Sequence, residues 1–399
     1  MIKKISIKNF YSIGEEQELS VEIGPKDILD DSAKKMSRIG SFNLVSCVIG
    51  HNASGKTNVL KAITFLFWLI NQSYTSFKSE DRIPYEQHKL LPNQSSQIMI
   101  EFFDKEVFYE YLIEFDQKKI LKERLRKKVM RMTSIFELER DSKSVKIKTT
   151  SLKLNKTDEA RFKERHNVAL LSSLIDTGYL SEITLFKNFE SNVRELRLMR
   201  NNVFPDLLNV SQAMYEDKSL SQEILNFVKG IDLGLSDFQF GEIRPTMKED
   251  KPEKILQVLE CIHETKNGNF ILPIFRESDG TQHGISLLSK ILLILKNGGL
   301  LVLDEIESGL HPYVVKKLIS LFESKQTNPN GGQLIFSTHQ HMLLNDRTKT
   351  QIFIAEKNEE TLETEVYRLD EVEGVRNDEN YFHKYIAGTY GGTPRFDWM

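Results

Sequence analysis

Apolar and polar residues alternate at the start of the chain, from Ile2 to Phe10 and again from Gln17 to Ile23. A period of two predicts strands, here a hairpin-like opening. The run from Phe42 to Gly50 is mostly apolar and shows no alternation, which is typical of a strand buried on both faces. Further strands, joined by short connections that make them mostly antiparallel, are expected at Ile98–Phe103, Val107–Phe115 and Ile135–Leu138.

The pattern changes near Leu154. From Thr157 to Lys229 the chain is charged, poor in glycine and spaced like helices, with breaks near Gly178 and Pro205, which predicts a helical insertion or lid. Strands and helices then alternate, and this alternation predicts a parallel sheet with helices on its faces. Two strand-like segments, Ile255–Ile262 and Phe270–Phe275, come first, and the alternating segments after them are Ser286–Leu295, Leu300–Leu303, Val314–Phe322 and Gln333–Phe336.

These patterns predict an α/β fold with a mixed sheet, an antiparallel β-layer and the helical insertion. We expect three parts: residues 1–154, which hold a glycine-rich loop, the insertion at 155–230, and residues 231–399, which complete the sheet. No internal repeat, low-complexity tract or long heptad pattern is present, so an extended coiled coil is not expected.

Composition is that of an ordinary globular protein, with 40% hydrophobic and 28% charged residues. The 54 Lys+Arg against 57 Asp+Glu give a net charge of −3, so any nucleic-acid partner needs a local patch. One candidate patch is the run 118–131, which is densely basic with Glu123 as its single acidic residue. This run favours either a grip on a phosphate backbone or a solvated face of the protein, and the sequence leaves both open.

The first residues are charged and lack the apolar core of a signal peptide, so we expect a cytoplasmic protein. The longest apolar run, Ala62–Ile70, is far shorter than the about 20 residues that cross a bilayer, and no membrane partner is expected. Cys47 and Cys261 lie in apolar stretches without metal-ligand spacing, which indicates two buried thiols.

A phosphate-binding loop is predicted at residues 50–57, where the sequence GHNASGKT follows a buried strand and precedes an apolar helix. Glycines at positions 50 and 55 let successive backbone N–H groups converge on phosphates, and the helix directs its positive end at them. A lysine adds a full charge at the β and γ oxygens, and a threonine hydroxyl suits Mg²⁺. The nucleotide-binding candidates here are Gly50, Asn52, Ala53, Ser54, Gly55, Lys56, Thr57 and Asn58.

Two carboxylates follow the short apolar strand Leu300–Leu303, namely Asp304 and Glu305. In open parallel sheets, ligands bind at the carboxyl ends of the strands, so these side chains should lie beside the phosphate loop. We expect Asp304 to hold the shell of Mg²⁺ together with Thr57. Glu305 is the expected catalytic base that orients and deprotonates the attacking water.

With these motifs in place, the chain resembles the ABC-type ATPase heads, and among them the AAA15-like branch of abortive-infection and RloA-type ATPases, related to OLD, SMC and RecF heads. The opening strand that ends in Asn9-Phe10 and the loop variant GHNASGKTNVLKAI carry the resemblance, which covers the chain outside the insertion. Two further segments carry it, ESDGTQ at 277–282 and LIFSTH at 334–339. The resemblance implies an ABC-like head that binds ATP and Mg²⁺.

The resemblance also implies site residues that spacing alone would not show. Ser278 and Gly280 match the signature motif that touches the γ-phosphate held by a second subunit, although Asp279 replaces a glycine of the transporter pattern. His339 matches the switch histidine that senses the γ-phosphate. The segment 308–312 stands at the D-loop position with His311 where transporters have aspartate, and Gln87 is left unassigned as a Q-loop residue.

The implied function is hydrolysis of Mg·ATP at a composite site that a homodimer or higher oligomer completes. We expect the sensor or switch of an anti-phage, abortive-infection system that acts through a separate effector, because no effector domain is recognisable in the sequence. The competing hypothesis is a RecF-type ATPase of DNA repair or maintenance that clamps DNA. The Gly-rich segment GTYGGTP at 388–394 resembles the ending of the same branch, without a role that the residues disclose.

Overall fold

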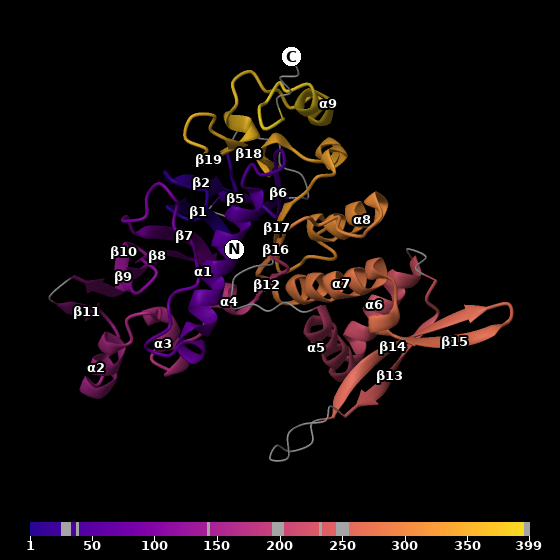
Figure 1. Cartoon of the computed structure of the whole chain (residues 1–399), viewed down its shortest axis with the longest axis horizontal. Helices are drawn as coiled ribbons and strands as arrows, with labels where there is room; N and C mark the ends of the chain where they lie inside the picture. The colour runs from indigo at the N-terminus through magenta and orange to yellow at the C-terminus, as the bar shows by residue number, and fades with distance from the viewer. Residues whose placement is uncertain are drawn as a thin grey trace. The chain divides into compact units, whose positions relative to one another are not determined.

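The computed structural model describes residues 1–24, 33–36, 40–141, 144–193, 203–230, 234–244 and 255–394. The chain divides into two compact units whose segments are interleaved in sequence (Figure 1). The first unit comprises Met1–Leu198, Ile294–Ile306 and Ile319–Met399, and the second comprises Met199–Leu293 and Glu307–Leu318.

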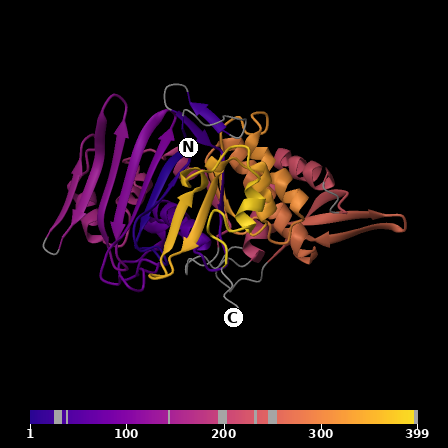
Figure 2. The ribbon, with the colours of Figure 1, turned by 90° about the horizontal axis from the view of Figure 1, so that it is seen from above.

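A seven-stranded antiparallel sheet forms one layer of the first unit, in the order β11-β10-β9-β8-β7-β1-β2. Figure 2 shows its long strands side by side. Short turns join consecutive strands, as the short connections in the sequence predict. The strands are β1 (Ile2–Lys8), β2 (Gln17–Ser20), β7 (Ser96–Asp104), β8 (Val107–Phe115), β9 (Ile120–Lys128), β10 (Met132–Arg140) and β11 (Val145–Thr149).

A six-stranded sheet forms the second layer, in the order β12-β16-β17-β6-β18-β19. Every pair is parallel except β18 with β19, so the predicted parallel core and the α/β class are confirmed. The central strands are buried along their whole length, which explains why they lack alternation. The strands are β6 (Val45–Ile49), β12 (Phe189–Ser191), β16 (Leu300–Leu303), β17 (Gln333–Ser337), β18 (Ile352–Lys357) and β19 (Thr364–Arg368).

Helix α1 (Lys56–Ser76) contacts strands of both sheets, β16 and β17 on one side and β1 on the other. A helix covered on several sides must be apolar nearly all round, and the run Ala62–Ile70 is buried at every position. The other helices of this unit are short: α2 (Lys156–Glu164), α3 (Leu170–Asp176), α4 (Thr184–Lys187), α9 (Tyr381–Ile386) and the 3₁₀ turns η2 (His341–Asp346), η3 (Lys349–Gln351) and η4 (Leu369–Glu371). None of the described helices is both long and apolar enough to cross a lipid bilayer.

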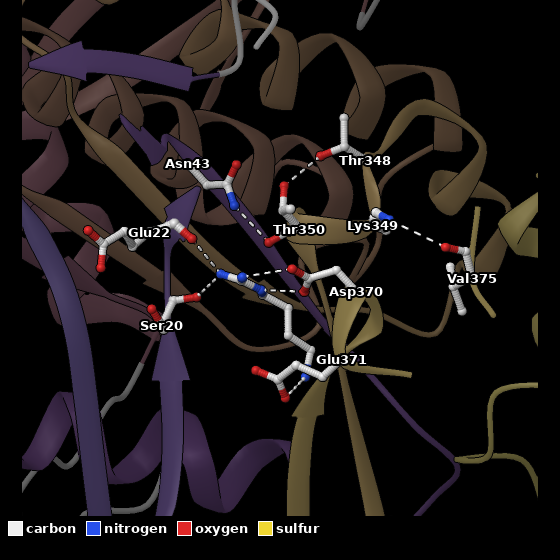
Figure 3. Close-up of polar contacts among 10 residues, drawn as sticks. Ser20, Glu22, Asn43, Thr348, Lys349, Thr350, Asp370, Glu371 and Val375 are labelled. Atoms are coloured by element: carbon white, nitrogen blue, oxygen red, sulfur yellow. Dashed lines mark hydrogen bonds and ion pairs between the residues drawn. The ribbon is translucent and has the colours of Figure 1, made fainter. Parts of the chain in front are cut away.

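The predicted opening hairpin is present as β1 and β2, but the chain then leaves that sheet for a small one, β3 (Glu22–Ile23), β5 (Gly40–Asn43) and β4 (Ala33–Met36). Arg368 ties this region to the parallel sheet, because its guanidinium donates to the carbonyls of Ser20 and Glu22, both at 2.7 Å, and pairs with Asp370 (Figure 3). Asn43 adds a bond to the Thr350 carbonyl.

The second unit holds a three-stranded antiparallel sheet of β13 (Asp237–Ile243), β14 (Leu256–Thr265) and β15 (Gly268–Pro273). Helix α5 (Val203–Glu216) packs on β14, and α6 (Lys218–Gly230) packs on α5. The turn η1 (Ile274–Arg276) leads into α7 (Asp279–Asn297), and α8 (Pro312–Glu323) begins in the same unit.

The stretch 155–230 contains helices α2 to α6, as its helix-like spacing predicts, but also the three-residue strand β12. Residues 194–202 of this stretch lie outside the described residues. Its first part, through Leu198, is grouped with the phosphate loop, whereas the rest belongs to the second unit. The division of the chain into 1–154, 155–230 and 231–399 stays a proposal.

Candidate functional site

The phosphate loop connects β6 to α1 through backbone conformations with positive φ, which glycine adopts most readily. Gly50 and Gly55 have φ of 153° and 105°, and Ala53 between them also has a positive φ, 64°. A Cβ on Gly50 would collide with the Ala355 carbonyl of β18, and one on Gly55 would collide with the Thr364 hydroxyl. The glycines are therefore needed both for their dihedral angles and for the close approach of neighbouring strands.

Two polar groups of this loop fit a bound phosphate. The Lys56 ammonium donates to the loop's own carbonyls, Gly50 at 2.8 Å and His51 at 3.1 Å, so it curves over the loop. The Ser54 hydroxyl is buried and has no hydrogen-bond partner in the part of the chain that the structure describes. An unsatisfied buried hydroxyl costs about 1 to 3 kcal/mol, a cost that an anionic ligand at the loop would remove.

Thr57 and Asp304 meet as the phosphate motif and the acidic strand end predict. The Thr57 hydroxyl donates to Asp304 Oδ1 across 3.3 Å, and Ser337 at the end of β17 donates to the same oxygen at 2.6 Å. Three strand or helix ends thus converge on one carboxylate at the carboxyl edge of the parallel sheet. Sequence reasoning missed Ser337, although it stands two residues before the predicted switch histidine.

Asn192 is a second residue that sequence reasoning missed. Its side-chain amide accepts a bond from the backbone N–H of Asp304 at 2.7 Å and donates to the backbone carbonyl of Asp304 at 3.0 Å. One amide therefore satisfies both main-chain groups of the acidic residue and fixes the turn after β16. Asn192 follows β12, whose three residues Phe-Glu-Ser show no apolar pattern, so the sequence carries no signal for it.

Glu305 and His339 lie close together, and both side chains are partly open to solvent. Glu305 Oε1 is 3.7 Å from His339 Nε2, and the two side chains are 57% and 39% exposed. The backbone of Glu305 has φ of 48°, an uncommon left-handed conformation, and its N–H donates to the Ser337 hydroxyl at 2.8 Å. A strained residue held by its neighbours presents its side chain in one direction, which suits a catalytic role.

The remaining loop candidates divide between exposed and engaged side chains. Asn52 is exposed at the outer side of the loop. Asn58 donates its amide at 2.7 Å to the Ser12 hydroxyl, which lies 2.7 Å from the Thr364 hydroxyl. Thr364 in turn donates to the Ser54 carbonyl at 3.0 Å. Asn58 is therefore part of a network that ties α1, the loop and β19 together.

The signature and D-loop candidates both belong to the second unit. Ser278 precedes α7 and caps it, because its hydroxyl accepts the Thr281 N–H at 3.2 Å. A Cβ on Gly280 would lie 2.7 Å from the Gly309 carbonyl, so these two segments pack backbone to backbone. His311 Nδ1 accepts the Tyr313 N–H at 3.2 Å at the start of α8. An aspartate can make the same cap, so the histidine replaces it without loss of the helix start.

Gln87 donates to the Gln94 carbonyl at 2.8 Å, in a loop that the amide of Asn9 also holds. Its side chain is engaged in that loop, and we assign it no role. No group of three or more His, Cys, Asp or Glu side chains that could hold a metal occurs among the described residues. A Mg²⁺ ion at the phosphate loop would instead use the Thr57 hydroxyl, Asp304, water and phosphate oxygens, the hard ligands that it prefers.

A glycine loop between a buried strand and a helix, with an acidic strand end beside it, defines the class of P-loop ATPases. Residues 45–345 match the family described as "AAA domain, putative AbiEii toxin, Type IV TA system". The chain belongs to this family of AAA/ABC-type ATPases, and the predicted ATPase class is confirmed. No curated protein is significantly similar to it.

The solved structures to which the chain is similar include three SMC heads, all at low identity. One is an SMC head bound to the C-winged helix domain of ScpA, 13% identical, which aligns over 93% of this chain and 98% of that chain with a TM-score of 0.47. The SMC head from Thermotoga maritima is 12% identical over 92% and 98%, with a TM-score of 0.41. An SMC head with an extended coiled coil, bound to the C-terminal domain of ScpA from Pyrococcus furiosus, is 13% identical over 93% and 97%, with a TM-score of 0.45.

Proposed function

We propose that this chain binds Mg·ATP at the phosphate loop and hydrolyses it at a site that a second copy completes. The observation that carries the proposal is the convergence of Thr57 and Ser337 on Asp304, at the same sheet edge as the loop. Nothing in a hydrophobic core requires this convergence, and a carboxylate that faces two hydroxyls beside a glycine loop suits a metal-bound phosphate.

Each residue has a distinct task in this proposal. Lys56 neutralises the β and γ oxygens, and Thr57 with Asp304 would hold Mg²⁺, which supplies charge neutralisation when bound. Glu305 orients a water for in-line attack on the γ-phosphorus and takes its proton as the bond to the β-phosphate oxygen breaks. His339, within 3.7 Å of Glu305, contacts the same region and responds to the γ-phosphate. Positioning and charge carry this chemistry without a covalent intermediate.

The second copy supplies Ser278 and Gly280. Ser278 caps the 19-residue helix α7, so its hydroxyl stands at a helix N-terminus, where an anion is favoured. The close packing of Gly280 on Gly309 joins the signature segment to the D-loop segment, so both would meet the opposite nucleotide as one rigid surface. The phosphate loop leaves the γ-phosphate open on one side, and a partner's signature would cover it.

Ser278→Arg tests this composite site. The large cation should leave ATP binding to a monomer nearly unchanged but abolish ATP-dependent dimerisation and hydrolysis. Light scattering with and without ATP, together with a phosphate-release assay, measures both. Ser219→Arg places the same side chain on an exposed serine of α6 in the same unit and should behave as wild type. Wild-type turnover by Ser278→Arg would contradict the shared site.

At the level of biology, we propose a sensor or switch ATPase in anti-phage defence that acts through a separate effector. The family description names a "putative AbiEii toxin" of a "Type IV TA system", and a link to a toxin system supports this role. The test is phage plating on cells that carry the gene with its neighbouring genes, as wild type or as Lys56→Ala. Protection should depend on an intact phosphate loop. Equal plating on both strains would contradict the role in defence.

The alternative, a RecF-type ATPase that clamps DNA, would need a basic surface, and the basic run 118–131 is the candidate; most of it forms strand β9. Its arginines face carboxylates on the neighbouring strands: Arg124 pairs with Glu110 at 2.8 Å, and Arg126 lies 3.8 Å from Glu137. Two of the run's eight basic residues, both arginines of β9, are thus engaged within the sheet. We therefore keep the defence ATPase as the proposal, and a salt-dependent DNA mobility shift would be the result that favours the alternative.

A further inference from the structure

The Gly-rich segment near the end of the chain is bonded directly to the phosphate loop. The backbone N–H of His51 donates to the Gly392 carbonyl at 2.8 Å. The Tyr385 hydroxyl of α9 donates to the same carbonyl at 2.8 Å. One carbonyl oxygen of the terminal segment therefore accepts a bond from the loop and a bond from the helix that precedes the segment.

The segment is also fixed from the side of β18. Glu356 accepts the Gly392 N–H at 3.0 Å and the Tyr367 hydroxyl at 2.8 Å. Gly391 and Gly392 have φ of 79° and 69°, which favour glycine. A Cβ on Gly392 would lie 2.5 Å from Ile354 Cγ2, so the backbone passes too close to β18 for any side chain.

Tyr385 has a second contact, with the segment that carries the switch histidine. Its ring centroid lies 4.8 Å from that of His341, two residues after His339. Helix α9, which carries Tyr385, packs on η2, which begins at His341. One buried side chain thus touches both the terminal segment at the phosphate loop and the turn after His339.

The hydroxyl of Tyr385 is a dependable donor. Burial raises the pKa of Tyr385 well above its usual value, so the group stays protonated at any physiological pH. The backbone N–H of His51 is likewise used within the protein, because it donates to the Gly392 carbonyl and not to a ligand. The loop groups that would bind phosphate start beyond it, so the bond from His51 fixes the base of the loop.

We propose that residues 385–392 form a positioning element of the ATP site, in which Tyr385 couples the phosphate loop to the switch segment. This inference rests on the proposed ATPase function. Preorganised N–H groups bind an anion better than groups that must be ordered on binding. Loss of the Tyr385 hydroxyl should loosen the loop and weaken nucleotide affinity. Loss of the ring should in addition release the turn after His339 and slow the chemical step.

The experiment compares Tyr385→Phe and Tyr385→Ala with the wild-type full chain. Tyr385→Phe removes one hydrogen bond and should raise the ATP dissociation constant and the KM about five-fold, with kcat within about two-fold of wild type. Tyr385→Ala should raise KM similarly and also lower kcat about ten-fold, because the contact with His341 is lost. Calorimetry with ATP and steady-state phosphate release measure the two quantities separately.

Tyr381→Phe is the matched control, because Tyr381 lies on the same helix and its hydroxyl donates to the Arg376 carbonyl, away from the loop. A purely structural role would make both Phe variants alike in KM and in melting temperature. Equal KM values for the two variants would overturn the inference. Absence of ATP binding by the wild type would instead overturn the proposed function on which it rests.

Gly392→Ala gives a second, independent measurement, since it displaces the carbonyl through backbone strain and the contact with Ile354. It should raise KM at least as much as Tyr385→Phe does. A folded Gly392→Ala variant with wild-type KM would contradict the proposal. If that variant does not fold, Tyr385→Phe alone decides the outcome.

Discussion

Each of the two large sheets of the first unit carries an acidic side chain of interest. One of these side chains is buried, and the other is exposed to solvent. On the antiparallel sheet, Glu123 of β9 is completely buried and accepts bonds from the N–H groups of Leu170 and Leu171, at 2.6 and 2.8 Å, and from the Tyr111 hydroxyl. On the parallel sheet, Glu305 stands at a strand end with a side chain that is 57% exposed. One carboxyl is fully engaged inside the protein and the other faces outward.

This difference separates a structural acid from a candidate catalytic one. Burial raises the pKa of Glu123 to about 7, although the N–H groups of Leu171 and Leu170 oppose the shift. A shifted pKa alone would nominate Glu123 as a functional residue. Its oxygens, however, are taken by internal donors, whereas Glu305 is accessible to water and lies beside His339. Exposure of the carboxyl to water therefore distinguishes the catalytic candidate from the structural acid better than a shifted pKa does.

The largest expected effect is on turnover by Glu305→Gln. The variant keeps the size of the side chain but cannot accept the proton of the attacking water, so kcat should fall about 1,000-fold. ATP affinity and the melting temperature should stay near wild type, because Thr57 and Asp304 are untouched. Single-turnover ATP hydrolysis measures the change, and Glu307→Gln is the control. Wild-type turnover would remove Glu305 as the base.

Lys56→Ala should produce the next largest effect, about 100-fold weaker ATP binding by calorimetry. The backbone cradle remains, but the charge that neutralises the β and γ oxygens is lost. Lys8→Ala, which removes an equal charge from a half-exposed position on β1, should bind ATP as wild type does. Unchanged affinity in Lys56→Ala would contradict the assignment of the phosphate loop.

Glu123→Gln should change stability and leave turnover within about two-fold of wild type. Because the pKa in the folded state, about 7, lies above the ordinary value of 4.5, this group's contribution to stability is complete below pH 4.5 and is lost as pH rises to about 7. Between pH 5 and 8 the wild type should lose about 2 to 3 kcal/mol from this group, and the variant should not. Urea unfolding at both pH values measures the difference. An equal pH slope would show that Glu123 is already ionised when folded.

Asn192→Ala should give the smallest of these changes in free energy. The substitution removes both hydrogen bonds to the backbone of Asp304. Turnover should fall about ten-fold, because the carboxylate is no longer held in one orientation. Asn188→Ala serves as the control. Asn188 directly precedes β12, at the end of the strand opposite to Asn192, and its amide donates to the Asn297 carbonyl. Equal turnover by the two variants would show that Asn192 only stabilises the sheet edge.

The sequence predicted the parallel sheet, and the meeting of the phosphate loop with the acidic strand end, because both leave local signals. Apolar runs without alternation identify β6 and β16. The polar residues beyond them, Lys56 with Thr57 after the glycine-rich loop and Asp304 with Glu305 directly after β16, are placed at the carboxyl ends of the strands by topology. The same reasoning predicted that Thr57 and Asp304 lie side by side. The structure places them within hydrogen-bond distance although 247 residues separate them.

Other parts of the fold depend on partners that are distant in the chain. The basic run 118–131 was not predicted as a strand, because Arg124 and Arg126 find their carboxylate partners, Glu110 and Glu137, only across the sheet. The strand β12 is too short to show a period, so Asn192 had no visible role. The hydrogen bond between His51 and Gly392 joins residues that are far apart in the sequence, so no local sequence pattern predicts it.

The most direct test of the shared ATP site is complementation between two inactive variants. Lys56→Ala has an intact signature and a defective loop, and Ser278→Arg has the reverse. In a mixed dimer, one of the two composite sites then carries both an intact loop and an intact signature. Titration of one variant with the other should restore part of the ATPase activity, with a maximum at an equal ratio. No recovery in dimers shown to be mixed would contradict the shared site.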